Sequence, residues 1–212
     1  MITDENVSCY VDSLLRDGDD LCRALRISAQ TQKVPIIRRQ SESFIKSLLL
    51  MKEPENILEI GTGIAYSAIF MAKVLPKTYI TTIENYEPRI IKAKENIKNA
   101  GLTERISLLE EDAQRALAQL EGPYDLIFLD GPKGQYEAFL PELLRLLEKG
   151  GILLCDNVLQ EGDIALSRFA LERRKRTIHE RLRSFLYDIT HSDELETSIL
   201  TIGDGMSLSI KL

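Results

Sequence analysis

The sequence predicts an α/β fold in which helices cover both faces of a mostly parallel sheet and a C-terminal hairpin adds antiparallel strands. Two observations support this expectation. Between residues 56 and 156, five short apolar runs alternate with amphipathic segments, and near the end two β-rich runs flank Gly203-Asp204-Gly205. A length of 212 residues fits one domain. We therefore expect a single domain over 1–212, with a helical cap over 1–52 and a Rossmann-like core over 53–212.

The first fifty residues are expected to be helical. The apolar residues that supply the helix faces are Leu14, Leu15, Leu21, Leu25 and Ile27. Pro35 is well placed to open a helix that runs through about Met51, because its fixed φ suits the first turn.

Strands and helices then alternate, a pattern that is typical of parallel strands joined by crossovers. The expected strands are Ile57–Ile60, Tyr79–Ile83, Ile106–Leu109, Leu126–Leu129 and Ile152–Cys155. The expected helices lie near Ser67–Leu75, Pro88–Ala100, Asp112–Leu120 and Tyr136–Leu147. The runs "LETSILTI" and "MSLSIKL" with their glycine-rich connection indicate a final hairpin, which brings the sheet to seven strands.

The composition excludes several classes of protein. The net charge is −6, so the molecule as a whole does not resemble a polyanion binder, and any nucleic-acid surface would be a local patch. Three cysteines without a C-x-x-C pair, and only two histidines, argue against a disulfide framework or a Cys/His metal site. The first residues are acidic and no apolar run approaches membrane-spanning length, so we expect a cytoplasmic protein without a membrane partner.

A glycine loop follows the first expected strand in "NILEIGTGIAYSAIF". Gly61 and Gly63 allow backbone N–H groups to approach a ligand, but the third glycine of the dinucleotide fingerprint is replaced by Tyr66. Glu59 is expected to face the same crevice, where it would suit an ammonium group better than a pyrophosphate. Glu84 ends the second strand, where a carboxylate can accept both ribose hydroxyls. Together these residues favour S-adenosylmethionine over NAD; an oxidoreductase or a nucleotide-binding module without turnover stays open.

Polar side chains end the fourth and fifth expected strands. Asp130 follows "LIFL", and Asp156 and Asn157 follow "ILLC". Because the carboxyl ends of parallel strands share one edge of the sheet, three oxygen donors should converge there, and such donors suit Mg²⁺. Either segment alone could simply cap a loop or a helix, but the two together favour a metal site.

These motifs carry a family resemblance. "ILEIGTGIAYSAIF", Glu84, "EEDA", "FLDGPKGQY" and "LLCDNVL" resemble the magnesium-dependent class I O-methyltransferases of the catechol and caffeoyl-CoA group, over nearly the whole chain. The resemblance implies a Rossmann-like methyltransferase fold, with S-adenosylmethionine and Mg²⁺ as cofactors. It implies that the donor is held by Glu59, Gly61, Gly63, Ser67, Glu84, Asp112, Ala113 and Asp130, and that the metal is held by Asp130, Asp156 and Asn157. Lys133 and Asp130 would be the catalytic pair, and a homodimer is implied.

Within this group the sequence is most similar to the bacterial tRNA 5-hydroxyuridine methyltransferases, through "KVPI", "PKGQY", "DNVL", "ERRKRTI" and "TSILTIGDGMSLS". Gly131-Pro132 before Lys133 departs from that pattern. The consecutive Arg173, Arg174, Lys175 and Arg176 read as a solvated helix segment on their own, and as a tRNA contact with the resemblance. The function expected is therefore methylation of 5-hydroxyuridine at the tRNA wobble position; the alternative is methylation of a small catechol-like phenol.

Overall fold

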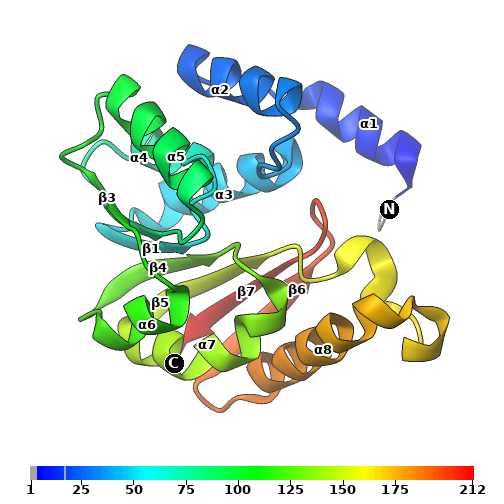
Figure 1. Ribbon diagram of the computed structural model, residues 1–212. Coiled ribbons are helices and arrows are strands. Elements are labelled where there is room, and N and C mark those ends of the chain that lie inside the picture. The colour runs from blue at the N-terminus through cyan, green and yellow to red at the C-terminus, as the bar shows by residue number, and fades with distance from the viewer. Residues whose placement is uncertain (1–3, 17) are drawn as a thin grey trace.

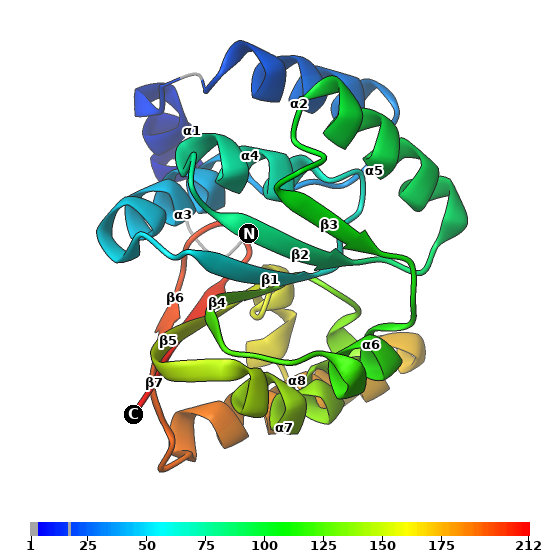
Figure 2. The same cartoon turned by 90° about the vertical axis from the view of Figure 1, so that its left-hand side faces the viewer.

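The computed structural model describes residues 4–16 and 18–212. Its centre is a seven-stranded sheet in the order β3-β2-β1-β4-β5-β7-β6 (Figures 1 and 2). The strands are β1 Asn56–Ile60, β2 Tyr79–Ile83, β3 Ile106–Leu109, β4 Tyr124–Leu129, β5 Leu147–Asp156, β6 Leu195–Leu200 and β7 Met206–Lys211. The first five are parallel, and β7 lies antiparallel between β5 and β6. The predicted fold class is thus confirmed, including the C-terminal hairpin.

Helices cover both faces of the sheet, as Figure 2 shows. The helices are α1 Glu5–Leu14, α2 Asp20–Thr31, α3 Arg39–Lys52, α4 Tyr66–Val74, α5 Glu87–Asn99, α6 Ala113–Gln119, α7 Tyr136–Leu146 and α8 Arg176–His191. Short 3-10 turns lie at η1 Lys133–Gln135, η2 Gln160–Ala165, η3 Arg168–Ala170 and η4 Arg173–Lys175. In the described part of the chain, no helix is long and apolar enough to cross a membrane.

Alternate residues of each central strand pack into two separate cores, because successive strand side chains point to opposite faces. Leu126 and Phe128 of β4 face the core under α2–α5, whereas Ile127 and Leu129 face the core under α6–α8. All four are fully buried. This two-sided burial explains why the strands appear in the sequence as unbroken apolar runs.

Three expectations about the helices were wrong. The helix expected to open at Pro35 begins at Arg39, and residues 35–38 precede it. Ile37 in that segment offers its carbonyl to Arg26 of α2 (N–O distance 3.0 Å). Leu14 and Ile27, expected to supply packing faces, are 62% and 58% exposed.

Candidate functional site

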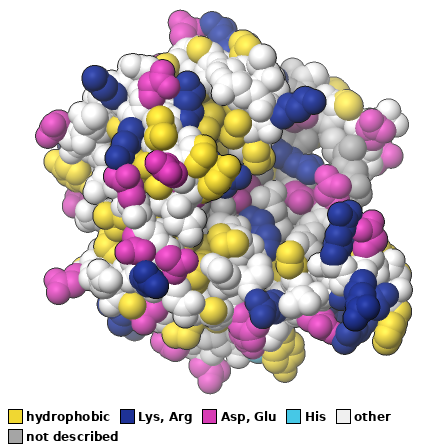
Figure 3. Space-filling model, viewed as in Figure 1, with side chains coloured by type: hydrophobic (Ala, Val, Ile, Leu, Met, Phe, Trp, Pro, Cys, Tyr) yellow, Lys and Arg dark blue, Asp and Glu magenta, His cyan; other side chains and the backbone are white. Residues whose placement is uncertain are grey.

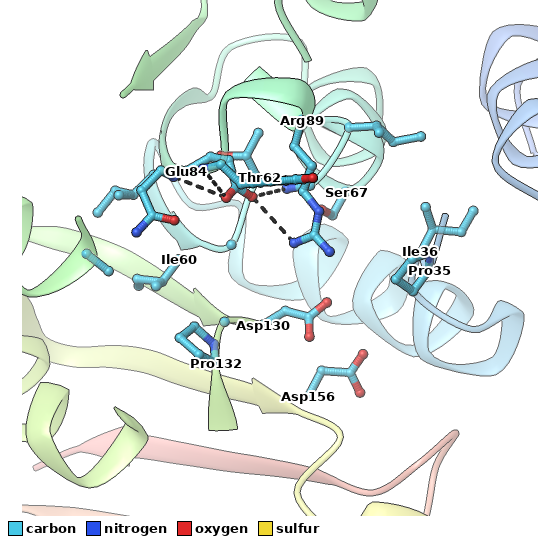
Figure 4. A pocket seen from close by; sticks show the side chains of 18 of the residues that line it. Pro35, Ile36, Ile60, Thr62, Ser67, Glu84, Arg89, Asp130, Pro132 and Asp156 are labelled. Carbon is cyan, nitrogen blue, oxygen red and sulfur yellow. Dashed lines mark hydrogen bonds and ion pairs between the residues drawn. The ribbon is translucent and has the colours of Figure 1, made fainter. Parts of the chain in front are cut away.

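A cavity of about 720 Å³ opens at the carboxyl ends of β1, β2, β4 and β5. The chain connections reverse direction between β1 and β4, which is where open α/β sheets bind their ligands. The far wall is formed by residues 35–38, which lie across from the strand ends (Figure 4). Figure 3 shows the hollow from outside, with acidic and basic side chains in it.

The glycine loop forms one wall of this cavity. Gly61 and Gly63 both have positive φ, +102° and +55°, and the Gly61 and Thr62 amides donate to the Ile83 carbonyl of β2 at 3.1 and 3.2 Å. A Cβ on Gly61 would overlap the backbone carbonyl oxygen of Asp130. The loop therefore packs directly against the end of β4, and only glycine fits at position 61.

Replacing Gly61 by alanine is expected to destabilise the fold by more than backbone strain alone. Gly150 is the matched control, because it also has positive φ (+76°) but no atom lies within 4 Å of its would-be Cβ. We expect Gly150→Ala to cost about 1–2 kcal/mol and Gly61→Ala several kcal/mol, as measured by urea denaturation. Equal losses in the two variants would show that the overlap with Asp130 relaxes without cost.

Glu84 lines the cavity at the end of β2 and is held rigidly there. Its carboxylate accepts hydrogen bonds from the backbone amides of Gly63 (3.0 Å), Asn85 (3.1 Å) and Tyr86 (3.0 Å). Arg89 lies 3.9 Å away as an ion-pair partner. The side chain is only 7% exposed, so these contacts fix the carboxylate at the cavity wall.

Glu59 does not face the crevice, in contrast to the sequence expectation. Its side chain lies on the face of β1 opposite to Leu58 and Ile60 and is fully buried. The carboxylate accepts hydrogen bonds from Ser67 and from Thr82 (2.5 Å). Ser67 itself lines the cavity. Glu59 therefore holds a cavity residue in place rather than meeting a ligand.

Burial raises the pKa of Glu59 to about 7, although hydrogen bonds from Ser67 and Thr82 oppose the shift. A raised carboxyl pKa means that the folded state keeps its proton while the unfolded state ionises. The resulting stability is complete below pH 4.5 and is lost as the pH rises to about 7.

The variant Glu59→Gln should remove this pH dependence. Relative to the unmodified protein, its free energy of unfolding should rise between pH 4.5 and 8 by up to about 3 kcal/mol, measured by denaturant titration without ligands. Glu55→Gln, at an exposed position preceding β1, is the control and should follow the unmodified protein. A constant difference between Glu59→Gln and the unmodified protein across this range would contradict the assignment.

The three expected metal ligands lie together at the ends of β4 and β5. Asp130, Asp156 and Asn157 all line the cavity, and the two carboxylates point into the same space (Figure 4). Asp156 is 1% exposed, and its carboxylate accepts a hydrogen bond from the backbone amide of Asn157 at 2.8 Å. Burial, reinforced by the negative charge of Asp130, raises the pKa of Asp156 to about 7. Among the described residues no group of three or more His, Cys, Asp or Glu side chains could hold a metal. A cation beside the two carboxylates would therefore take its further oxygen ligands from groups such as the Asn157 side-chain amide or water.

Lys133 is anchored beside these carboxylates. Its ammonium group donates to Asp130 Oδ1 at 2.9 Å and to the Tyr136 hydroxyl at 2.8 Å. Tyr136 in turn donates to the Leu129 carbonyl at 2.9 Å. Burial raises the pKa of the Tyr136 phenol well above its ordinary value, so the hydroxyl remains a donor. The unusual Gly131-Pro132 pair thus leaves Lys133 directed toward the carboxylate edge.

Asp112 and Ala113 also line the cavity, as the sequence analysis expected of cofactor-binding residues. Asp112 caps α6 by accepting hydrogen bonds from the Gln114 amide (3.1 Å) and the Arg115 amide (3.4 Å). The cavity lining also includes charged residues that the sequence analysis did not single out, among them Arg89 and Glu111. Glu111 lies within the quoted "EEDA", but the sequence gives no signal that separates its role from that of Asp112.

The sequence analysis expected the basic residues 173–176 to lie in one helix, but they do not. The first three form the η4 turn, and only Arg176 begins α8. Lys175 pairs with Asp163 at 2.8 Å and Arg174 with Glu172 at 2.7 Å. None of the four lines the cavity. Arg173, Arg174 and Lys175 are exposed, and Arg176 is half-buried.

Together, a mixed sheet with antiparallel β7, a glycine loop after β1 and a fixed carboxylate after β2 define a Rossmann-like methyltransferase. The chain belongs to the O-methyltransferase family, whose model matches residues 13–212. It is an S-adenosylmethionine-dependent O-methyltransferase of the catechol and caffeoyl-CoA type.

Individual relatives agree with this membership. The chain is 34% identical over 167 residues to a catechol O-methyltransferase of Niastella koreensis, and this alignment covers 76% of each of the two chains. It is 31% identical to tapetum-specific methyltransferase 1 of Arabidopsis thaliana, over 80% of this chain and 75% of that protein. The Bacillus cereus O-methyltransferase, solved in complex with SAH, superposes with a TM-score of 0.85 at 26% identity over 100% of both chains. The SAH-bound Podospora anserina methyltransferase PaMTH1 gives 0.88 at 26% identity, over 98% of this chain and 94% of that one.

Proposed function

We propose that this enzyme methylates one of two adjacent oxygens on a planar ring, and that its substrate is a small catechol-like phenol. The observation that carries this proposal is the convergence of Asp130, Asp156, Asn157 and Lys133 at one end of the cavity that also contains Glu84. Two ring oxygens side by side would match a site in which a cation held by the carboxylates lies near the Lys133 ammonium group.

The residues present fit a divalent cation. Two carboxylates in one crevice repel each other, which is one reason why the pKa of Asp156 is raised, and a cation between them would relieve this repulsion. Asp130, Asp156 and Asn157 would hold Mg²⁺ through oxygen atoms, the ligands this ion prefers. When bound, the ion would lower the pKa of a hydroxyl that chelates it and fix the direction of that oxygen.

The remaining chemistry falls to the side chains of the protein. Glu84 would orient the methyl donor through its ribose, and Ser67 would bind its amino-acid end. As a neutral amine, Lys133 would take up the hydroxyl proton; as an ammonium, it would instead stabilise the phenolate. Asp130 and Tyr136 hold its nitrogen in position in either case. The substrate oxygen then forms a bond to the methyl carbon as the carbon–sulfur bond breaks, and the sulfonium leaves as a neutral thioether.

The choice of a small phenol follows from the relatives. Proteins similar to this chain, from Niastella koreensis and Mycobacterium tuberculosis, are named catechol O-methyltransferases. No relative reported above is named for a tRNA substrate, which leaves the wobble-uridine reading without support from the comparisons.

A tRNA nucleoside is retained as the second candidate because of one surface. Arg173 and Arg174 lie in the exposed segment that leads from β5 to α8, with Phe169 78% exposed in the same segment. An exposed aromatic ring beside arginines can stack on a base and contact phosphates. In 5-hydroxyuridine, O5 and O4 would replace the two catechol oxygens.

The test is methyl transfer from radiolabelled S-adenosylmethionine to catechol, caffeate and tRNA lacking the wobble modification. We expect methylated catechols, loss of activity in excess EDTA and recovery with Mg²⁺. Gain of 5-methoxyuridine in tRNA without methylation of any catechol would move the assignment to the second candidate. Full activity in EDTA would reject the metal.

A further inference from the structure

Arg38 lines the cavity, but its ion-pair partner is not among the residues that line it. Among the described residues, three cationic side chains line the cavity: Arg38, Arg89 and Lys133. Arg89 lies by Glu84 on the cofactor side, and Lys133 donates to Asp130. Arg38 lines the cavity next to the segment of Pro35 and Ile36. Figure 4 shows Pro35 and Ile36 across from Asp130 and Asp156.

The present partner of Arg38 is Glu161, which lies outside the cavity lining. The guanidinium donates to Glu161 Oε1 at 3.0 Å, and the two side chains are 43% and 69% exposed. Such a surface ion pair contributes little to stability, because solvent screens both charges. A substrate anion can therefore replace Glu161 at small cost.

The place of this pair is fixed by the tip of the β6–β7 hairpin. The Leu159 amide donates to the Asp204 carbonyl at 3.1 Å, and the buried Asp204 carboxylate accepts from the Glu161 amide. Arg38 Cδ lies 3.7 Å from the position that a Cβ on Gly203 would occupy, so its stem packs over this glycine. Both members of the pair thus contact one rigid turn, which presents the guanidinium at the cavity wall.

We propose that Arg38 determines substrate specificity by binding an anionic group on the ring, and that Glu161 competes with this group for the guanidinium. The inference rests on the proposed function, because it requires a ring whose hydroxyls lie at the carboxylate edge. Because residues 35–38 line the wall that faces that edge, the guanidinium would reach a ring substituent distant from the two hydroxyls. The anion expected is a carboxylate; a phosphonate has the same charge chemistry.

The experiment compares protocatechuate, a catechol with a ring carboxylate, with its uncharged carboxamide, and measures the ratio of their kcat/KM values. Arg38→Gln should lower this ratio about tenfold or more, mainly through KM for the carboxylate. Glu161→Gln should raise it by up to about fivefold, since the competing carboxylate is gone. In the double variant the gain from Glu161→Gln should disappear. A catechol phosphonate distinguishes a general anion site from one selective for carboxylates.

The control is Lys77→Gln, which removes one exposed positive charge from the loop that precedes β2, at the opposite edge of the sheet. This variant should keep the ratio of the unmodified enzyme. If the unmodified enzyme methylates both diols and Arg38→Gln keeps their ratio, the role of Arg38 is overturned and the proposed function stands. If the unmodified enzyme methylates neither diol, the proposed function fails and this inference fails with it.

Discussion

Replacing Asp156 by alanine is expected to reduce methyl transfer by roughly a thousandfold or more, while binding of S-adenosylmethionine changes little. The variant lacks one of the two carboxylates that would bind the cation. Such a cation stabilises the charge of the transition state by several kcal/mol. Cofactor binding should survive, because Glu84 and the glycine loop lie at β1 and β2, away from β5. The measurements are steady-state kinetics in saturating Mg²⁺ and calorimetric titration with S-adenosylmethionine.

The same variant should not unfold the protein. Asp156 is a buried carboxylate whose pKa is raised to about 7, so its charge costs stability at neutral pH when no cation is bound. Asp188→Ala, at an exposed position of α8, is the control for the substitution itself. Turnover of Asp156→Ala within tenfold of this control would remove the basis of the metal site.

Replacing Lys133 by methionine gives the second large effect. Methionine keeps the apolar length of the side chain but removes the ammonium group that donates to Asp130 and Tyr136. We expect kcat to fall by about 10²–10⁴-fold, the usual contribution of a positioned proton-transfer group. Lys149→Met, at an exposed position of β5, is the matched control and should retain activity.

A further measurement separates chemistry from structure in the Lys133 variant. If Lys133 acts on the substrate hydroxyl, the variant should recover part of its rate on phenols of lower pKa, which need less help to lose their proton. A uniform loss across phenols of different acidity, together with a lowered melting temperature, would assign Lys133 a structural role only.

The strands could be predicted from the sequence because burial on both faces leaves a direct trace. Runs such as Ile152–Cys155 are apolar without interruption, and the glycines at 203 and 205 mark the hairpin by their positive φ. The start of α3 could not be predicted in the same way. Pro35 suits a first helical turn, but the Ile37 carbonyl is taken by Arg26 from another helix, a contact that no local pattern shows.

The site residues show the same division. The positions of Asp130, Asp156 and Glu84 follow from the rule that strand ends share an edge. The orientation of Glu59 depends instead on Ser67 and Thr82, which approach it only in the folded chain. The alternation of side chains along β1 could have predicted this orientation, because Glu59 must point to the face opposite to that of its neighbours Leu58 and Ile60.

The position of β7 has a consequence for the order of biosynthesis. Met206 of β7 pairs with Asp156 of β5. Because β7 follows α8 and β6 in the chain, this neighbour of β5 is translated last. Until then β5 has an open edge, and the loop beyond it lacks its contacts with Asp204 and Gly205. A ribosome-bound chain that ends before β7 should therefore already contain the glycine loop and Glu84, yet remain catalytically silent.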